Sequence, residues 1–465
     1  MSRNPKDIAA LDHAHVWHPF TQMRDWLASR PLMLVSGKGA VLTDDQGRDY
    51  LDANSSIWTN LHGHRQPRLD AALRRQLGKV AHVSSLGLAN EPAARLAAAL
   101  ARESGLPKAF FSDDGSTAME AALKLAHEHA QRTHGQGARG RFLSLRGAYH
   151  GDTVGAVSLG HIDLFHRPYR KLLFPTDAVM APNCYRCPFN RARPEARDAR
   201  DYRKCQWECV GKAARAMEKA ARKGRPHVAM VYEPVVQGAA GMVMQPQGWL
   251  PRVAEAARSH GLLLVADEVM TGMGRTGGAS LFAGNNQGVV PDLLAMAKGL
   301  SGGYVPLAAT MASQPIFDSF LGDYGEFKTF FHGHSYTGNP LGCAVALESL
   351  AILHGPASIR QRARLASWMA RDIPAAWNHR IVGDVRVSGL IGAVELVRDR
   401  ATRAPFDLRE RMGIRVCEAM ARRGVLTRPI GNVIVLMPPY CTTRAQWGRI
   451  LQALDESLEE VGATS

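Results

Sequence analysis

Two short apolar stretches end in residues that could do chemistry on a carbonyl compound. Leu262–Ala266 runs into the acid pair Asp267 and Glu268, and Leu293–Ala297 runs into Lys298. Runs of this length, rich in aliphatic residues and bounded by Gly or Pro, are typical of buried parallel strands. Because ligands bind beyond the carboxyl ends of such strands, we expect Asp267 and Lys298 to face one crevice.

This acid and this lysine suit chemistry through an imine. Partial desolvation at a strand end lowers the pKa of a lysine, as attack on a carbonyl requires. An acid opposite it can hold a protonated pyridine nitrogen, which makes pyridoxal phosphate (PLP) an electron sink. For the pair alone, a salt bridge between Asp267 and Lys298 at a surface turn is the simpler interpretation.

The elements that must position this pair alternate between strand and helix. Strands are expected at Arg141–Leu145 and Val228–Glu233, and helices at Glu91–Ala101, after Gly115 and at Trp249–Ser259. The alternation predicts an α/β fold with a mostly parallel central sheet flanked by helices. A hairpin is expected at Val41–Asp52, strand-like segments at Val385–Val397 and Gly424–Met437, and helices at Leu341–Leu353 and Ala445–Val461.

Composition bounds the possible functions. The 465 residues are 46% apolar, enough for a large core and two connected domains. The net charge of +15 is scattered along the chain, so we expect neither nucleic acid nor a membrane as partner. The N-terminus lacks the apolar core of a secretory signal, and no run approaches a membrane span. Seven cysteines in such a chain indicate a reducing cytoplasm and free thiols.

Several segments resemble one known family. The resemblance is to the class III aminotransferases, which use PLP and have fold type I. It is carried, in the order found in that family, by the segments LLLVADEVMTGMGRTG, AMAKGLSGGYVPLAATM and FFHGHSYTGNPLGCAVAL. Further segments resemble the branch of that family that serves biotin synthesis. They are HVWHPFTQM, SSIWTNLHGH, GAYHGDTVGAVS, EPVVQGAAGM and LTRPIGNVIVLMPPY. The resemblance covers nearly the whole chain. It implies a large PLP-binding domain at 66–345 and a smaller α+β domain built from 1–65 and 346–465.

The resemblance also implies roles for the cofactor side of the site. Lys298 would carry PLP and act as the base, Asp267 would hold the pyridine nitrogen protonated, and Tyr149 would stack on the ring. Gly115 and Ser116 would open a helix whose N–H groups bind the phosphate. Ser116 as an ordinary helix N-cap and Tyr149 as a packing residue are the alternatives.

On the substrate side, the resemblance implies contributions from both ends of the chain. Trp58 and Gly333 would line the substrate pocket, although a buried structural role for Trp58 is as good an interpretation. Arg428 would bind a substrate carboxylate through its guanidinium fork; a surface salt bridge is the alternative. His334 would lie beside the phosphate contact, and Ser335 would reach the phosphate bound by a neighbouring subunit, which implies a homodimer with shared sites.

Four cysteines form a C-x2-C-x17-C-x3-C pattern within an expected insertion at 182–210. The residues are Cys184, Cys187, Cys205 and Cys209. Two close thiol pairs suit a structural zinc ion or an iron–sulfur cluster. Four reduced thiols in a surface excursion are an equally good interpretation.

The activity that the resemblance implies is ping-pong transfer of an amino group to 8-amino-7-oxononanoate, giving 7,8-diaminononanoate. S-adenosylmethionine is the default donor. Phe20 and Ile57, where enzymes using that donor often have Tyr and Trp, bring the chain nearer to relatives that use lysine. The alternatives are another class III ω-amino acid or amine–pyruvate transaminase, a non-catalytic PLP-binding protein, and a basic nucleic-acid-binding protein.

Overall fold

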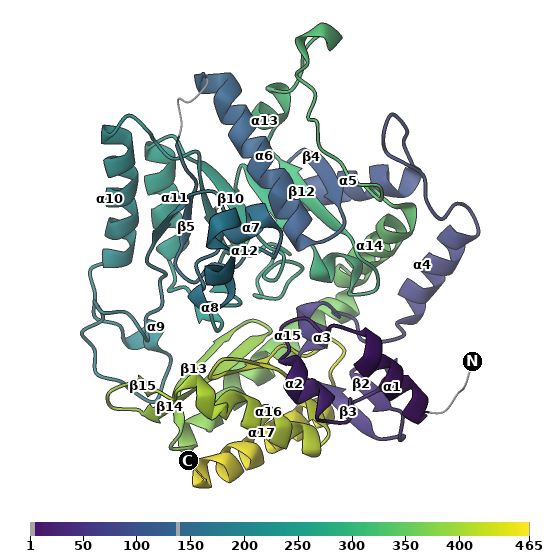
Figure 1. The fold of residues 1–465 in the computed structure, drawn as a ribbon, viewed down its shortest axis with the longest axis vertical. Helices are drawn as coiled ribbons and strands as arrows, with labels where there is room; N and C mark the ends of the chain where they lie inside the picture. Colours follow the sequence, from purple (N-terminus) through teal and green to yellow (C-terminus); the bar gives the residue numbers. More distant parts are fainter. Residues whose placement is uncertain (1–4, 136–139, 465) are drawn as a thin grey trace.

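The computed structural model describes residues 5–135 and 140–464 and is organised around a central seven-stranded sheet (Figure 1). Its strands lie in the order β4-β12-β11-β10-β7-β5-β6. They span Lys108–Ser112 (β4), Ala308–Ala312 (β12), Leu293–Met296 (β11), Leu263–Asp267 (β10), Ala229–Tyr232 (β7), Leu143–Leu145 (β5) and Asp177–Val179 (β6). Strand β12 runs antiparallel to both of its neighbours, and the pairs from β11 to β6 are parallel. The predicted mostly parallel α/β sheet is confirmed.

Alternate residues of the central strands pack against different helices. Val265 of β10 belongs to the core beneath α6 (Gly115–His134) and α7 (Val154–Leu159). Leu264 and Ala266 face the opposite layer, formed there by α10 (Glu208–Arg222) and α11 (Trp249–Ser259). Farther along that layer lie α5 (Glu91–Ser104) and α14 (Pro340–Leu353). Burial on both sides explains why the central strands are continuously apolar.

Helix α6 begins with a capping box. The Asp114 side chain accepts from the Thr117 backbone N–H, and the Thr117 side chain accepts from the Asp114 backbone. The N-cap is therefore Asp114, and the alternative of Ser116 as the cap is wrong. The Ser116 hydroxyl instead accepts a 3.1 Å hydrogen bond from the Asp152 backbone N–H.

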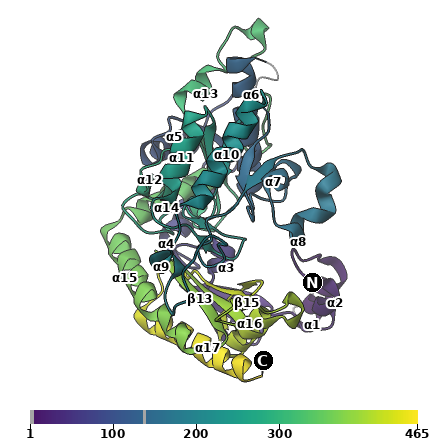
Figure 2. The same ribbon diagram turned by 90° about the vertical axis from the view of Figure 1, so that its left-hand side faces the viewer.

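Segments from both ends of the chain share the lower part of the molecule (Figures 1 and 2). A four-stranded sheet has the order β1-β2-β3-β16. Its strands are Leu34–Lys38 (β1), Val41–Asp44 (β2), Asp49–Asp52 (β3) and Val425–Leu426 (β16). Strand β3 pairs in parallel with β16, so an N-terminal hairpin is completed by a C-terminal strand. This pairing supports the small domain that we propose from 1–65 together with 346–465.

A second sheet of this lower part has the order β13-β14-β18-β17, with β15 paired to β14. The strands are Val382–Ser388 (β13), Ile391–Asp399 (β14), Val433–Leu436 (β18), Pro429–Ile430 (β17) and Ala404–Pro405 (β15). Its helices are α15 (Pro356–Asp372), α16 (Met412–Arg422) and α17 (Arg444–Ala463). A two-stranded hairpin, β8 (Val236–Gln237) with β9 (Val243–Met244), contacts β13 from the large-domain side.

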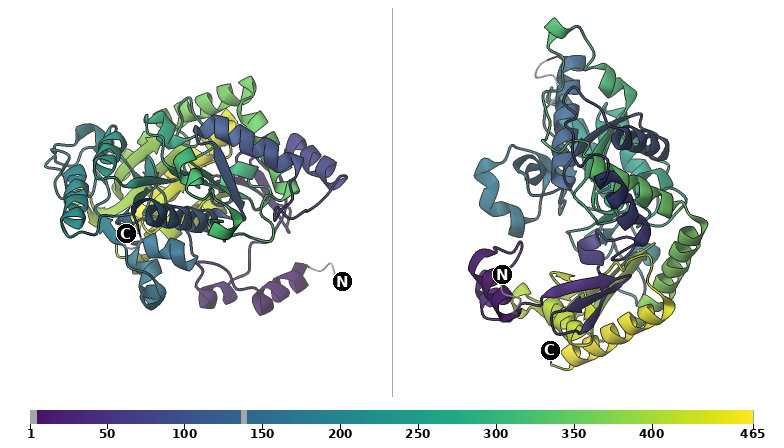
Figure 3. Two further views of the ribbon diagram at one scale, coloured as in Figure 1. Left: turned by 90° about the horizontal axis from the view of Figure 1, so that it is seen from above. Right: turned by 90° about the vertical axis from the view of Figure 1, so that its right-hand side faces the viewer.

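The N-terminal helices lie beside the lower sheets rather than packing between them. Helices α1 (Pro5–His15) and α2 (Met23–Leu27) lie at one side, below α8 (Asp163–His166), as Figures 2 and 3 show. Phe20 contacts Phe165 of α8 edge-on, with ring centroids 5.4 Å apart. Among the described residues, no single helix is long and apolar enough to cross a membrane; only the bent pair Pro340–Leu353 and Pro356–Asn378 reaches that length and composition jointly.

Candidate active site

The carboxyl ends of β10 and β11 open into a cavity of about 450 Å³. Asp267 is the last residue of β10, and Lys298 follows β11 by two residues at the start of a 3₁₀ turn. Residues from several other elements complete the wall. Those predicted from the sequence are Trp58, Gly115, Ser116, Tyr149, Asp267 and Lys298, and all six line this one cavity.

Lys298 is partly buried, and its backbone conformation is unusual. Its φ of +39° lies in the left-handed region, which side chains other than Gly rarely adopt. Burial lowers the pKa of the Lys298 amine, against the opposing effects of Asp267 and Glu233. The ammonium also lies 5.0 Å from the centre of the Trp58 ring. A lowered pKa makes the free amine, which is the form that attacks a carbonyl, more accessible at neutral pH.

Asp267 is held by a partner that the sequence argument missed. Nδ1 of His150 lies 2.7 Å from Oδ2 of Asp267, and the Val269 backbone N–H donates to Oδ1 at 3.0 Å. Burial opposes charge on His150, but the hydrogen bond and the negative charge of Asp267 raise its pKa overall. The only sequence signal was a histidine beside Tyr149, in a loop that follows another strand of the same sheet.

The start of α6 forms a tight cup at one end of the cavity. A Cβ on Gly115 would lie 2.8 Å from Val269, and one on Gly151 would lie 2.0 Å from the Ser116 hydroxyl. Both positions therefore require glycine. The N–H groups in the first turn of a helix have no partner within the helix and carry its positive dipole end. The cup is suited to a phosphate dianion.

Tyr149 forms one wall of the cavity. Its hydroxyl donates a 2.6 Å hydrogen bond to Asp152, which fixes the tilt of the ring. The ring of His166 lies nearly parallel to the Tyr149 ring, at an interplanar angle of 12° and a centroid distance of 6.3 Å. Burial raises the pKa of Tyr149, so the phenol remains neutral.

Two further parts of the cavity wall, an acid and a backbone turn, were not assigned from the sequence. Glu233 follows β7 and accepts a 2.7 Å hydrogen bond from the Gly238 backbone N–H. Burial raises the pKa of Glu233 to about 7, although His150 nearby lowers it. Gly238 and Ala239 lie in the turn between β8 and β9 and line the cavity beside Trp58. Both lie within EPVVQGAAGM, which the sequence identified only as a family motif.

The structure does not bring four of the expected residues into this cavity. Gly333, His334 and Ser335 lie on a partly exposed segment, where His334 pairs with Asp113 at 3.1 Å. Arg428 is exposed, and its guanidinium donates to the backbone carbonyl of Phe20 at 2.9 Å. The N-terminal segment therefore reaches the arginine that the sequence placed on the substrate side.

The expected metal site is not supported. Cys184, Cys187, Cys205 and Cys209 line one small cavity. However, within residues 5–135 and 140–464 no group of three or more His, Cys, Asp or Glu is arranged to hold a metal ion. The thiol of Cys205 instead accepts a 3.0 Å hydrogen bond from Arg203. Burial raises the pKa of Cys184 to about 12 and that of Cys209 to about 11, so both are neutral thiols in the metal-free protein.

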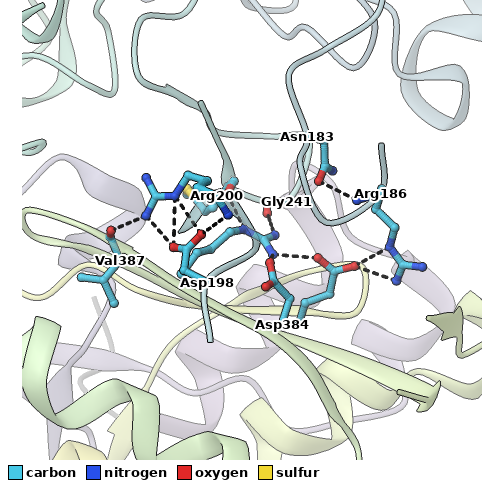
Figure 4. Close-up of polar contacts among 10 residues, drawn as sticks. Asn183, Arg186, Asp198, Arg200, Gly241, Asp384 and Val387 are labelled. Carbon is cyan, nitrogen blue, oxygen red and sulfur yellow. Dashed lines mark hydrogen bonds and ion pairs between the residues drawn. The ribbon is translucent and has the colours of Figure 1, made fainter. Parts of the chain in front are cut away.

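The insertion that carries these thiols is ordered by ion pairs and hydrogen bonds to the C-terminal sheet. Figure 4 shows Arg186 and Arg200 directed toward this sheet, beside Asp384 and Val387 of β13. Arg186 pairs with Glu395 of β14 at 2.7 Å, and Arg200 donates to the Val387 carbonyl at 2.8 Å. These contacts account for an ordered insertion without a metal.

Comparison with known proteins agrees with this geometry. The family described as Aminotransferase class-III matches residues 25–458. The adenosylmethionine-8-amino-7-oxononanoate aminotransferase of Geobacter sulfurreducens is 46% identical over 452 residues, covering 97% of each chain. The crystal structure of the enzyme of the same name from Methanocaldococcus jannaschii superposes with a TM-score of 0.90 at 35% identity, covering 98% of this chain and 99% of that one. A PLP-bound amine transaminase from an uncultivated Pseudomonas species gives a TM-score of 0.87 at 33% identity, with 96% and 98% coverage. The chain belongs to the class III aminotransferases.

Proposed function

We propose that this chain is a PLP-dependent transaminase that converts 8-amino-7-oxononanoate to 7,8-diaminononanoate in biotin synthesis, with S-adenosylmethionine as the default amino donor. The observation that carries the proposal is the pair formed by a partly buried Lys298 and a buried Asp267 at the ends of adjacent strands, beside a phosphate cup. The names of the relatives, whose similarity covers almost the whole chain, support the substrate.

The residues that line the cavity fit PLP. The cup at Gly115 and Ser116 suits its phosphate, Asp267 its pyridine nitrogen, and the Tyr149 ring one face of its own ring. Bound PLP would supply an electron sink for the negative charge that develops at the carbon bearing the transferred nitrogen. Because His150 holds one oxygen of Asp267, that carboxylate keeps a fixed direction toward the site.

Lys298 would serve twice in the reaction. Its amine holds the cofactor at rest and, once an incoming amine replaces it, takes up and returns the proton that moves between two carbons. Desolvation favours the neutral amine that this proton transfer needs. The two substrates would bind in turn to the same cavity, so ping-pong kinetics are expected.

The segment around Ser335 supports a homodimer with shared sites. Gly333 and Ser335 are exposed in the single chain, and large apolar side chains near them are exposed as well, among them Phe331 (74%) and Tyr324 (94%). Such surface is uncommon on a monomer and suits an interface. In the proposed dimer, Ser335 reaches the phosphate bound by the partner subunit, and Gly333 lies against the partner's substrate.

The identity of the amino donor is the most detailed part of the proposal, and it depends on the residues of the substrate side. Arg428 would bind the carboxylate of 8-amino-7-oxononanoate, beside Trp58. Phe20 supplies no hydroxyl and Ile57 supplies no ring, which makes lysine the second candidate donor. Seven free cysteines support the cytoplasm as its compartment.

One experiment tests the proposal directly. The purified protein would be given 8-amino-7-oxononanoate with S-adenosylmethionine or with lysine in parallel, and 7,8-diaminononanoate would be measured. Product with either donor supports the proposed reaction, and the donor that gives the faster turnover is identified as the amino donor. Turnover of amines with pyruvate and none of 8-amino-7-oxononanoate would favour the second candidate, an ω-transaminase, which the structural similarity to an amine transaminase supports.

A further inference from the structure

A buried arginine outside the catalytic cavity binds two different parts of the molecule together. Arg386 lies on β13, and its side chain is 6% exposed. Its guanidinium pairs with Asp384 at 2.6 Å and with Glu395 at 2.8 Å. Such a buried cation is tolerated only where acceptors surround it, because removing a charge from water is costly.

The remaining donors of Arg386 hold a backbone turn of the large domain. Nε donates to the Met242 carbonyl at 2.7 Å, and a terminal nitrogen donates to the Gly241 carbonyl. Figure 4 shows Gly241 above Asp384, each with a polar contact to the guanidinium between them. Met242 has a φ of +52°, a left-handed conformation that costs free energy in a residue other than Gly. The turn therefore depends on outside contacts to keep its shape.

Gly238 and Ala239 of this turn line the cavity beside Trp58, which the proposed function places on the substrate side. The turn begins at Gly238, whose carbonyl accepts from the Met242 N–H at 2.9 Å. A Cβ on Gly238 would lie 3.0 Å from Met270 and 3.4 Å from the Trp58 ring, so the wall is packed closely. A small shift of the turn would change the space beside Trp58.

The cysteine-containing insertion contributes to the same arrangement. Glu395 uses one oxygen for Arg386 and the other for Arg186 of the insertion, which approaches at 2.7 and 2.9 Å. Arg186 thereby fixes the carboxylate that orients Arg386. Only a planar guanidinium can serve carboxylates on one side and two carbonyls on the other; a lysine at 386 would keep the charge and lose the fork.

We infer that Arg386 is a positioning residue for substrate recognition, which sets the turn 238–242 against the bound substrate and is itself oriented by Arg186 through Glu395. It touches neither the phosphate cup nor Asp267. Its loss should therefore weaken substrate binding, while leaving cofactor binding and the chemical step largely unchanged. The inference rests on the proposed function only for the choice of substrates.

The test compares Arg386→Lys with Arg200→Lys in the full-length holoenzyme. Arg200 is a matched control, because it also donates to a carbonyl of β13 and pairs with an acid but contacts neither Glu395 nor the turn. We expect Arg386→Lys to raise KM for 8-amino-7-oxononanoate about tenfold, the factor that corresponds to about 1.4 kcal/mol of lost binding, with kcat and the Kd for PLP within about twofold. Arg200→Lys should change neither KM nor kcat.

A second readout needs no turnover. Hydrogen exchange of backbone amides in the peptide that spans 236–244 should be faster in Arg386→Lys than in the wild type, and unchanged in Arg200→Lys. Arg186→Lys, at the half-exposed end of the network, should give the same changes at smaller size and serves if Arg386→Lys does not fold. The inference would be overturned if Arg386→Lys, or Arg186→Lys in its place, had the same KM and the same exchange rate as Arg200→Lys. A wild-type enzyme inactive on 8-amino-7-oxononanoate would contradict the proposed function instead, and the exchange comparison would still decide the inference.

Discussion

His150 and Asp267 form a buried pair in which the imidazole Nδ1 lies 2.7 Å from the carboxylate Oδ2. His150 lies in the loop after β5 and Asp267 is the last residue of β10, so the two meet at the carboxyl edge of the central sheet. Burial lowers the pKa of His150, but the hydrogen bond to Asp267 and the negative charge of that carboxylate raise it overall. The carboxylate that faces the cavity is therefore held in place by a buried imidazole.

His150→Gln should separate the effect of charge from that of direction. Glutamine can still donate to Asp267 but carries no charge, and a charge-assisted hydrogen bond exceeds a neutral one by about 1 kcal/mol. We expect kcat/KM of His150→Gln to fall about fivefold to tenfold. Asp267→Asn should lose most activity and bind PLP more weakly. Steady-state kinetics and cofactor titration measure both. A near-normal rate for Asp267→Asn would contradict the role proposed for that acid.

Lys298→Ala removes both the attachment point and the base. Loss of a positioned base alone costs about 10²- to 10⁴-fold, so turnover should fall at least that far and the visible absorbance of lysine-bound PLP should disappear. Lys108→Ala is a suitable control, because that ammonium lies over the Phe317 ring, away from the cavity. Borohydride reduction followed by peptide mapping should place the pyridoxyl label on Lys298 in the wild type. A label on another lysine would refute the assignment.

Glu233→Gln should make the cofactor-free protein more stable at pH 8 than the wild type, with less effect at pH 5. The pKa of Glu233 rises from 4.5 to about 7 through burial, so the unfolded chain loses the proton first as the pH rises. The native state is then progressively disfavoured between pH 4.5 and 7, by up to about 3 kcal/mol at about 1.4 kcal/mol per unit. Glutamine removes this penalty and can still accept from Gly238. Denaturant unfolding at both pH values measures the difference.

Glu268→Gln is the contrasting variant for that measurement. Burial raises the pKa of Glu268 to about 7 as well. Here, however, the Ala283 and Gly284 N–H groups each donate a short hydrogen bond to a different carboxylate oxygen, at 2.6 and 2.8 Å. The second contact of Glu233, from the Tyr149 N–H, is much longer, at 3.5 Å. A glutamine would place its amide nitrogen against one of these donors, so Glu268→Gln should destabilise the protein at both pH values. Equal stabilisation by both glutamines would show that burial of the charge alone governs these sites.

Local patterns predicted the strands and helices that are buried on more than one side. Strands β10 and β11 lie within one residue of the apolar runs that predicted them, and α11 has the predicted bounds, because Gly and Pro mark the ends of such segments. The start of α6 was less certain, since Ser, Asp and Thr in SDDGST can each cap a helix. Only the reciprocal Asp114–Thr117 contacts decide it.

The partners of the site depend on contacts between distant segments. His150 and Asp267 are 117 residues apart, and Arg186 and Glu395 are 209 apart. No periodicity or spacing within either segment indicates such a pairing, because it arises only when the sheet and its loops are assembled. The four cysteines illustrate the opposite case. Their spacing suggested a metal, but burial and the Arg203 contact favour neutral thiols.

The shared active sites of the proposed homodimer can be tested by complementation between two inactive variants. Lys298→Ala removes the amine, and Ser335→Glu would place a negative charge beside the partner's phosphate, so each homodimer should be nearly inactive. In a mixed dimer, one site lacks both functions, and the other combines the intact Lys298 of one chain with the intact Ser335 of its partner. Random exchange of subunits should therefore restore about a quarter of the wild-type activity, because about half of the dimers are mixed and one site in each is intact. Co-expression with two different affinity tags isolates the mixed dimers. If these have no activity although each variant is folded and dimeric, then Ser335 acts within its own chain, and the model of shared sites is wrong.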